Sequence, residues 1–431
     1  MEERVRSPRR ISGTVSPPGD KSISHRAAMY NAIAEGEAVV ENFLRGADCL
    51  ATLNCLRRLG VEWRWRDDGM LYIKGSGRDG LREPDSVLDC RNSGTSIRLL
   101  TGLLSGQPFF SVLTGDASLR SRPMLRVIDP LRRMGARISG RERDSKAPLA
   151  VQGGQLKGIR YDMPVASAQV KSAVVLAGLY ADGETTVIES APTRDHTERM
   201  LSAMGADVSF GEGPRVTVKR LVRQMSALSM RVPGDISSAA PWLVLGAAHP
   251  DAEIRIAGVG VNPTRTGILD ILQMMGADIR LEEERRVGAE PVADIVVRSS
   301  QLRGVVVEGD LVPRAIDELP LVALAGCFAE GETVIREAAE LRVKESDRVR
   351  TTALGLRALG ASVEETTDGI RVKGGQALKG ATTLSRGDHR LAMMLAIGGS
   401  LAAGETVVRG SESVAVSYPW FWKDLRGLTR R

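Results

Sequence analysis

Residues 167–218 read SAQVKSAVVLAGLYADGETTVIESAPTRDHTERMLSAMGADVSFGEGPRVTV. The segment from 169 to 180 is almost entirely apolar, which is typical of a helix that is buried on all sides. Gly183 follows where the helix is expected to end, because glycine easily adopts the left-handed conformation of a helix C-terminus, and residues 185–188 then predict a strand. A second helix ends at Met204-Gly205, before two expected strands at 208–210 and 215–218. This stretch therefore predicts one small α/β unit built around a buried helix.

The same order of features occurs six times along the chain. Buried helices are expected at residues 24–34, 95–104, 169–180, 238–248, 318–329 and 390–401. The end of the second helix is marked by Leu59-Gly60, Met134-Gly135, Met204-Gly205, Met275-Gly276 and Leu359-Gly360. The spacing of about 70 to 85 residues is too long for the common solenoid repeats and suits a small subdomain.

The six copies fall into two groups of three, before and after Pro233-Gly234. The sixth copy stops near residue 428, and we expect the N-terminal strand at residues 11–15 to complete it. The chain then crosses between domains near Pro17-Pro18-Gly19 and near Pro233-Gly234. We predict an α/β (α+β) fold with one domain of residues 19–233 and another of residues 1–18 and 234–431.

The composition of the 431 residues, 42% apolar and 26% charged, is that of a globular protein. No apolar run approaches the ~18 residues of a membrane span, and residues 1–10 lack a hydrophobic signal core, so an intracellular protein without a membrane partner is expected. The four cysteines show no metal or disulfide spacing. A net charge of +6 with only 4% aromatic residues favours a small, multiply charged anion over nucleic acid as the ligand.

Unusual polar residues stand at the starts of the six buried helices. They are Lys21-Ser22-Ile23-Ser24-His25-Arg26, Asn92-Ser93-Gly94-Thr95, Ser167-Ala168-Gln169, Asp235-Ile236-Ser237-Ser238, Asp317-Glu318 and Asp388-His389-Arg390. Helix N-termini bind anions through free N–H groups and the helix dipole. Capping alone explains most of the Ser, Asn and Asp residues, and His25 and His389 are expected to be structural. Capping does not explain Lys21, Arg26 or Arg390, because cations there oppose the dipole.

The loop after the first strand of each copy is also polar. Asp195 and Asp347 in these loops can equally be ordinary first-turn acids. Over both kinds of position, seven cations stand out: Lys21, Arg26, Arg122, Arg194, Lys344, Arg348 and Arg390. Guanidinium groups match phosphate and carboxylate oxygens two at a time. The set therefore favours ligands that are rich in both groups.

These segments resemble the signature segments of the 3-phosphoshikimate 1-carboxyvinyltransferase (EPSP synthase) family. The similar segments are residues 19–26, 92–95, 119–124, 341–348 and 387–393, and the similarity runs in order from about Gly13 to Pro419. The resemblance implies a two-domain inverted α/β barrel that closes on its substrates. It also implies transfer of enolpyruvyl from phosphoenolpyruvate to the 5-hydroxyl of shikimate 3-phosphate in aromatic amino-acid synthesis, in a cytoplasmic monomer without metal or cofactor.

The resemblance also assigns site residues. It implies that shikimate 3-phosphate is bound by Lys21, Ser22, Arg26, Ser167, Ala168, Gln169, Arg194, Asp317 and Lys344. Phosphoenolpyruvate would be bound by Lys21, Gly94, Arg122, Gln169, Arg348 and Arg390. Asp317 would accept the hydroxyl proton, Glu345 would protonate the methylene carbon, and Lys21 would assist the leaving phosphate. The two carboxylates would thus lie among cations, which favours their ionised forms.

Two departures and two alternatives accompany this interpretation. Residues 416–419 lack a lysine that many members carry there, and residues 167–169 and 193–196 are similar to the branch called class II. One alternative is a UDP-N-acetylglucosamine enolpyruvyl transferase, which is expected to carry a reactive cysteine within residues 119–124. The other is a non-catalytic protein that binds phosphate ligands or RNA ends, which gains nothing from Asp317 and Glu345 in its pocket.

Overall fold

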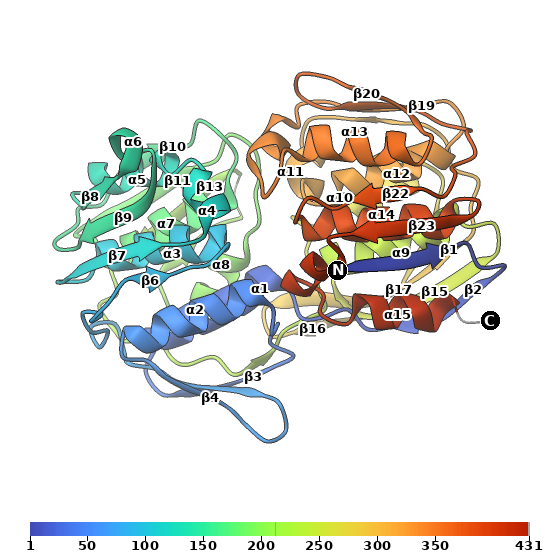
Figure 1. The fold of residues 1–431 in the computed structure, drawn as a ribbon. Coiled ribbons are helices and arrows are strands. Elements are labelled where there is room, and N and C mark those ends of the chain that lie inside the picture. Colours follow the sequence, from blue (N-terminus) through green and yellow to red (C-terminus); the bar gives the residue numbers. More distant parts are fainter. Residues whose placement is uncertain (212, 430–431) are drawn as a thin grey trace. The chain divides into compact units, whose positions relative to one another are not determined.

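Six small sheets, each beside a buried helix, make up the computed structural model, which describes residues 1–211 and 213–429 (Figure 1). Contacts divide the chain into two units. The N-terminal unit comprises Gly19–Val232 and Val287–Glu290, and the C-terminal unit comprises Met1–Pro18, Pro233–Arg286 and the chain from Pro291 onward. The prediction of a mixed α/β fold built from six repeated units is confirmed.

The N-terminal unit holds the first three copies. Its helices are α1 (Lys21–Ala32), α2 (Ala47–Arg58), α3 (Gly94–Ser105), α4 (Ala117–Ser121), α5 (Leu125–Arg133), α6 (Arg141–Asp144), α7 (Ala168–Gly178) and α8 (His196–Ala203). Its strands, in sheet order, are β14 (Met230–Arg231), β3 (Glu37–Glu41), β5 (Leu71–Lys74) and β4 (Glu62–Trp65); β6 (Leu88–Asp89), β7 (Phe110–Thr114), β9 (Lys146–Gln152) and β8 (Arg137–Gly140); and β10 (Arg160–Asp162), β11 (Glu184–Ile188), β13 (Arg215–Lys219) and β12 (Val208–Ser209).

The C-terminal unit holds the other three copies. Its helices are α9 (Ile236–Ala248), α10 (Gly267–Met274), α11 (Leu311–Ala315), α12 (Leu319–Phe328), α13 (Arg348–Ala358), α14 (His389–Leu401) and α15 (Phe421–Thr429), with 3₁₀ turns η1 (Ala339–Val343) and η2 (Ser411–Val416). Its strands, in sheet order, are β16 (Asp278–Val287), β17 (Glu290–Arg298), β15 (Ala252–Gly260) and β2 (Ile11–Val15); β18 (Val306–Val307), β19 (Glu332–Ile335), β21 (Ile370–Lys373) and β20 (Ser362–Glu365); and β1 (Glu2–Arg6), β23 (Glu405–Arg409) and β22 (Thr382–Leu384).

One pairing rule holds in four of the six sheets. The strand before a buried helix pairs in parallel with the strand after it, as β10 does with β11 around α7. In the other two sheets, which include the strands at the chain crossings, the first and fourth copies exchange these strands. Strand β2, which precedes α1 in the chain, pairs with β15 of the fourth copy, whereas β14, which precedes α9, pairs with β3 of the first copy.

The expectation that residues 11–15 complete the sixth copy is therefore wrong. Strand β1 completes it, pairing antiparallel with β23 from Glu2 opposite Arg409 to Arg6 opposite Glu405. This strand is hard to predict because it carries a single apolar residue, Val5, among four charged ones at a sheet edge. Arg4 and Arg6 both bind Glu405 of the neighbouring strand, which holds the edge in register.

The buried helices owe their burial to composition, as expected. Every residue of α7 from Val170 to Gly178 is buried, and α12 is buried from Leu319 to Cys327. The Leu/Met-Gly marks end the second helices because glycine accepts the left-handed backbone there, as at Gly205 with φ of +90°. Each unit has its own apolar core around these helices.

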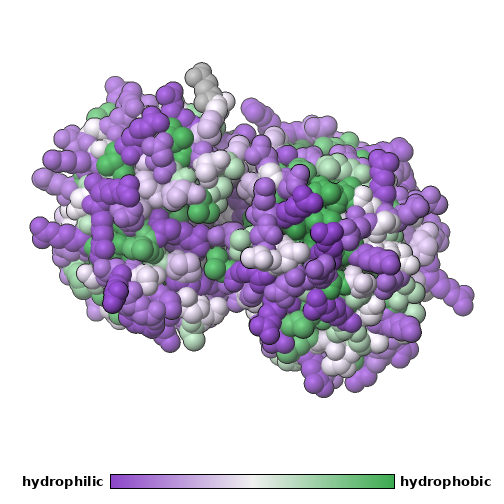
Figure 2. Space-filling model, turned by 90° about the horizontal axis from the view of Figure 1, so that it is seen from above, coloured by the Kyte–Doolittle hydropathy of each residue, from purple (hydrophilic) through white to green (hydrophobic). Residues whose placement is uncertain are grey.

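Hydrophilic residues cover most of the visible face of each unit, and the apolar patches are small and scattered (Figure 2). In the described part of the chain, no helix has both the length and the apolar character needed to cross a membrane. All four cysteines are buried free thiols, as the lack of cysteine spacing predicts.

The position of β1 leads to a test by substitution. A Cβ at Gly399 of α14 would lie 2.5 Å from Cγ2 of Val5 and 2.6 Å from Cβ of Thr406. Gly399→Ala should therefore lower the free energy of unfolding by about 1 to 3 kcal/mol in urea titrations. Val5→Ala should recover part of this loss in the double variant, because the two sites are coupled. Gly427→Ala is the control, since no atom lies within 4 Å of its added Cβ; additive effects of the two changes would mean that β1 does not pack there.

Candidate active site

In the N-terminal unit, the start of α1 holds a cation against the helix dipole. Asp20 caps the helix by accepting from the backbone N–H of Ile23 at 2.8 Å. The side chain of Lys21 is 14% exposed, and its Nζ lies 3.1 Å from Oδ2 of Asp48 on α2. A carboxylate therefore balances this lysine, which could also exchange partners with an anionic ligand.

Two of the residues predicted to bind shikimate 3-phosphate, Arg26 and Arg194, meet at Ser22, and Arg26 is buried. Its guanidinium donates to the carbonyl of Ser22 at 3.0 Å, to Oγ1 of Thr197 at 2.8 Å and to Oγ of Ser172 at 2.7 Å. Arg194 donates to the Ser22 hydroxyl at 3.3 Å. The starts of α1 and α8 are thus joined by two arginines and one serine.

A second group joins the starts of α3 and α7. Gln169 accepts from Nη1 of Arg98 at 2.7 Å and donates to Oγ1 of Thr95 at 3.0 Å. Arg98 also donates to the carbonyl of Pro123 at 3.1 Å. The structure therefore ties Gln169 to the Arg122-Pro123 turn through an arginine that the sequence interpretation missed.

Gly94 is the first residue of α3, beside two guanidinium groups. A Cβ there would lie 2.7 Å from Nη1 of Arg98 and 3.2 Å from Nη1 of Arg122. Arg122 itself is buried and donates a very short hydrogen bond to Oδ1 of Asn92. A methyl group at position 94 would therefore require the Arg98 guanidinium to move and would closely contact that of Arg122.

Ser167 and Ala168 lie at the start of α7. The Ser167 hydroxyl is 3.5 Å from the backbone N of Val170, in the geometry of an ordinary N-cap. Ala168 is the first helical residue, and it offers only its backbone and a methyl group. Their position at a helix N-terminus suits an anion.

His25 takes a structural place, as expected. It is fully buried, and its Nδ1 lies 2.7 Å from Oγ1 of Thr52. Burial, with help from Lys21 and Arg26, lowers the pKa of His25 well below its ordinary value. The ring is therefore neutral at physiological pH.

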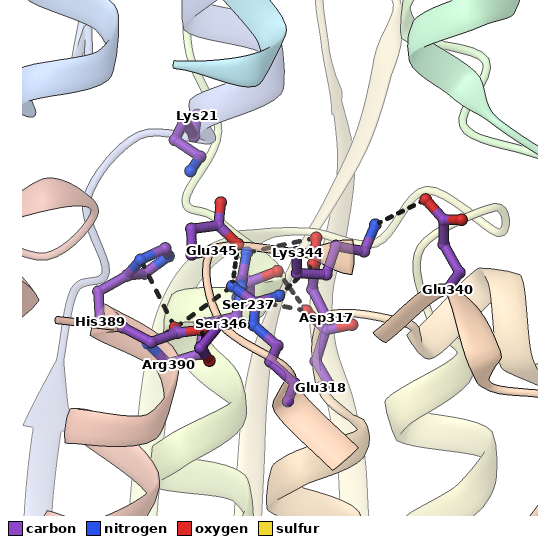
Figure 3. Close-up of polar contacts among 12 residues, drawn as sticks. Lys21, Ser237, Asp317, Glu318, Glu340, Lys344, Glu345, Ser346, His389 and Arg390 are labelled. Atoms are coloured by element: carbon purple, nitrogen blue, oxygen red, sulfur yellow. Dashed lines mark hydrogen bonds and ion pairs between the residues drawn. The ribbon is translucent and has the colours of Figure 1, made fainter. Parts of the chain in front are cut away.

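In the C-terminal unit, the predicted site residues Asp317 and Glu345 share the guanidinium of Arg348. Figure 3 shows these two carboxylates close to Lys344 and Arg390. The Arg348 guanidinium, 1% exposed, donates to Oδ1 of Asp317 at 3.0 Å, to Oε2 of Glu345 at 2.6 Å and to Oδ2 of Asp388 at 2.9 Å. Burial alone lowers the pKa of Arg348, but these three carboxylates outweigh it and raise the pKa. The expectation that Asp317 and Glu345 lie among cations is confirmed.

Arg390, on α14, binds two carboxylates at the start of α12. Its Nη2 lies 3.4 Å from Oδ2 of Asp317, and its Nη1 lies 3.8 Å from Oε1 of Glu318. Asp388 caps α14 by accepting from the backbone N–H of Arg390 at 3.0 Å. Burial alone raises the pKa of Asp388, but Arg348 outweighs it, so the pKa is lowered.

Lys344 lies beside this cluster with its side chain 25% exposed (Figure 3). Its Nζ is 3.8 Å from Oε1 of Glu340. Burial lowers the pKa of Lys344, against the opposing effect of Asp317 and Glu340. A ligand phosphate there would gain a partly desolvated cation.

The sequence interpretation missed the residues that hold these groups in place. Arg98, Ser172 and Thr197 lie inside predicted helices, where a single polar residue has no distinguishing pattern. Arg98 of α3, like Lys171 of α7, is nevertheless a cation inside a buried helix, and this contrast is the signal that could identify it.

The comparisons with known proteins identify the family of this chain. The model of the EPSP synthase (3-phosphoshikimate 1-carboxyvinyltransferase) family matches residues 5–425. This chain belongs to the EPSP synthase family. A curated relative named 3-phosphoshikimate 1-carboxyvinyltransferase, from Roseiflexus castenholzii, is 56% identical, with 98% of each chain covered. One of the same name from Pelotomaculum thermopropionicum is 55% identical, covering 98% of this chain and 97% of its own length.

Solved structures extend the comparison. EPSP synthase from Acinetobacter baumannii is 46% identical with a TM-score of 0.87, covering 99% of this chain and 98% of its own. The enolpyruvyl transferase NikO from Streptomyces tendae shares the fold at 18% identity, with a TM-score of 0.78 and coverage of 99% and 96%. The family membership overrules the UDP-N-acetylglucosamine alternative.

The Arg348 cluster generates a pH prediction. Because its pKa is lowered in the folded state, Asp388 stabilises the fold fully at pH values above its ordinary pKa of 3.8. That contribution is lost as the pH falls through the lowered value. Asp388→Asn keeps a capping oxygen, so at pH 7 it should cost about 1.5 to 3 kcal/mol of unfolding free energy, the worth of a charged hydrogen bond.

The difference between the wild type and Asp388→Asn should begin to shrink below about pH 4, where the aspartate of the unfolded chain takes up a proton, and should be lost as the pH falls through the lowered pKa of the folded state. Urea unfolding at both pH values measures it. Asp116→Asn is the matched control, because Asp116 also caps a helix but binds the amide of Asn92. A difference that is constant from pH 7 to pH 3 would contradict the role given to Asp388.

Proposed function

We propose that this EPSP synthase family member transfers the enolpyruvyl group of phosphoenolpyruvate to the 5-hydroxyl of shikimate 3-phosphate and releases phosphate. The observation that carries the proposal is the sharing of Arg348 by Asp317 and Glu345. Two carboxylates fixed on one buried cation suit a reaction that needs both a proton acceptor and a proton donor. Full-length relatives with this enzyme name support the same reaction.

Each unit supplies part of the substrate contacts. From the N-terminal unit we assign Lys21, Ser22, Arg26, Ser167, Ala168, Gln169 and Arg194 to shikimate 3-phosphate, and Lys21, Gly94, Arg122 and Gln169 to phosphoenolpyruvate. From the C-terminal unit we assign Asp317 and Lys344 to shikimate 3-phosphate, and Arg348 and Arg390 to phosphoenolpyruvate. The hydrogen bonds of Arg26 and Arg194 around Ser22 support the first set, and the two guanidinium groups beside Gly94 support the second.

The reaction is an addition followed by an elimination. Asp317 accepts the 5-hydroxyl proton as that oxygen bonds to C2 of phosphoenolpyruvate, while Glu345 gives a proton to the methylene carbon. Glu345, now a carboxylate, then takes a proton back from the resulting methyl group, which restores the double bond as phosphate leaves with the bridging oxygen. Lys21 assists this departure, because a cation stabilises the charge that develops on the leaving group.

A cytoplasmic monomer in chorismate and aromatic amino-acid biosynthesis follows as part of the proposal. The four buried free thiols suit a reducing compartment. Residues 119–124 contain no cysteine, so the reactive cysteine that the UDP-N-acetylglucosamine alternative requires is absent from that loop. A non-catalytic anion-binding protein is disfavoured because it would gain nothing from the carboxylates of Asp317 and Glu345 in its pocket.

A phosphate-release assay tests the function. The purified protein should release inorganic phosphate when phosphoenolpyruvate and shikimate 3-phosphate are both present, and none when either is omitted. Release from phosphoenolpyruvate alone would indicate a phosphatase. Absence of release at saturating concentrations of both substrates would overturn the proposal.

Two neighbouring residues should separate binding from chemistry. Lys344→Ala should raise the KM for shikimate 3-phosphate about 10- to 100-fold, the value of a lost charged hydrogen bond. Glu345→Gln should leave that KM within about threefold and lower kcat roughly 10²- to 10⁴-fold, because its proton matters only in the carbon step. Steady-state kinetics of both variants measures the split. Near-normal turnover in Glu345→Gln would remove Glu345 from the mechanism.

Glyphosate should inhibit in competition with phosphoenolpyruvate, because it resembles that substrate in size and charge but is slightly longer. An added methyl group at position 94 would meet Arg98 and Arg122, and it should intrude on the longer ligand more than on the substrate. Gly94→Ala should therefore raise the inhibition constant about 100-fold, as a clash of a few kcal/mol requires. Equal inhibition constants in the two forms would show that Gly94 does not line this pocket.

A further inference from the structure

Helix α7 carries a lysine inside the core of the N-terminal unit. The side chain of Lys171 is 1% exposed, and its Nζ lies 2.7 Å from Oε1 of Glu198 on α8 and 3.1 Å from Oε1 of Glu189, which follows β11. It also donates to the carbonyl of Thr193 at 3.5 Å. The Glu198 and Glu189 side chains are 1% and 7% exposed, so all three charged groups are withdrawn from water.

The repeated fold does not require this lysine. Four residues after the N-cap, where α7 has Lys171, the other buried helices carry Ser24, Ile97, Ala239, Val322 and Ala392. Buried ions are unfavourable unless they are well paired. Because the same position in the other five copies holds small or apolar residues, the packing of the repeat does not require a charged residue there. A feature found in one copy alone points to a role that only this copy has.

The contacts of Lys171 lead to the residues proposed to bind shikimate 3-phosphate. Thr193, whose carbonyl it holds, directly precedes Arg194. Thr193 also donates a very short hydrogen bond to Glu189, which closes the loop onto the same carboxylate. Ser167, at the start of α7, is one helical turn before Lys171. The ammonium group therefore connects two segments that meet the ligand in the proposed function.

The residues next to Lys171 and Glu198 anchor a third segment. Oγ of Ser172 lies 2.7 Å from Oγ1 of Thr197, and both hydroxyls accept from the guanidinium of Arg26. The ion cluster and this hydroxyl cluster therefore fix α7, α8 and α1 against one another within the N-terminal unit. Burial lowers the pKa of Lys171, but Glu198 and Glu189 outweigh it and raise the pKa, so the ammonium keeps its charge at physiological pH.

We propose that Lys171 is a positioning residue for shikimate 3-phosphate, which sets the spacing of Arg194 from the start of α7 by holding the Thr193 carbonyl, Glu189 and Glu198. The inference rests on the proposed function. We expect Lys171 to affect the binding of phosphoenolpyruvate less, because Gln169 is held separately by Arg98 and Thr95.

The full-length chain carrying Lys171→Met tests this inference. The dissociation constant of shikimate 3-phosphate, measured by calorimetry, should rise at least tenfold. The KM for phosphoenolpyruvate should change less than threefold. Because this variant leaves Glu189 and Glu198 buried without a cation, it can also lose stability.

A second variant separates positioning from stability. Lys171→Met with Glu189→Gln and Glu198→Gln removes all three charges, and neutral replacement of buried ions is often tolerated. It should recover the wild-type melting temperature while the dissociation constant for shikimate 3-phosphate stays at least tenfold raised. Val151→Ala, which truncates a buried side chain of strand β9 and leaves a cavity, is the control for general destabilisation. It should leave the dissociation constant for shikimate 3-phosphate unchanged.

Two results would overturn the inference while leaving the proposed function intact. One is wild-type affinity for shikimate 3-phosphate in the neutral triple variant. The other is an equal loss for both substrates, which a merely structural lysine would produce. Failure of the wild-type chain itself to release phosphate would instead overturn the proposed function.

Discussion

The guanidinium of Arg348 is the contact on which the C-terminal half of the candidate site depends. It is buried and shared by Asp317 before α12, Glu345 before α13 and Asp388 at the start of α14. Loss of any one carboxylate removes a partner from a charge that water cannot reach, which is strongly destabilising. The same interaction therefore holds three helix starts together and keeps two candidate proton carriers at fixed places.

In the N-terminal unit, Lys171 is also paired with carboxylates, but the buried cation of the candidate site, Arg26, is held differently. Arg26 binds the Ser22 carbonyl and the hydroxyls of Ser172 and Thr197, which are neutral acceptors. Neutral partners leave more of the cation's field for an anionic ligand than carboxylates do. This contrast fits a division of work in which the N-terminal unit mainly binds charge and the C-terminal unit moves protons.

Much of the fold could be predicted because it repeats. Apolar helices and the glycines that end them follow local rules, so the six copies are visible in the sequence. Strand β1 could not be predicted because its pairing with β23 links residues about 400 positions apart and leaves only Val5 to show an apolar face. The exchange of β2 and β14 is likewise a long-range pairing without a local signal.

The same difference between local and long-range signals decides which residues of the candidate site could be predicted. Cations at helix starts were conspicuous because they violate a local preference, and Asp317, Glu345, Arg348 and Arg390 do meet. Arg98 and Lys171 escaped notice because their partners, Gln169 in one case and Glu198 in the other, come from other segments of the chain. A sequence pattern can identify a residue whose charge is unfavourable at its place in its own helix. Only the structure identifies a residue whose side chain connects two different elements.

The central claim is that these clusters break the carbon–oxygen bond of phosphoenolpyruvate rather than its phosphorus–oxygen bond. Phosphoenolpyruvate labelled with ¹⁸O at the bridging position tests this directly, with the released phosphate analysed by mass spectrometry after reaction with shikimate 3-phosphate. Addition and elimination predict that the phosphate carries the label. Unlabelled phosphate, with the label retained on the three-carbon fragment, would contradict the account.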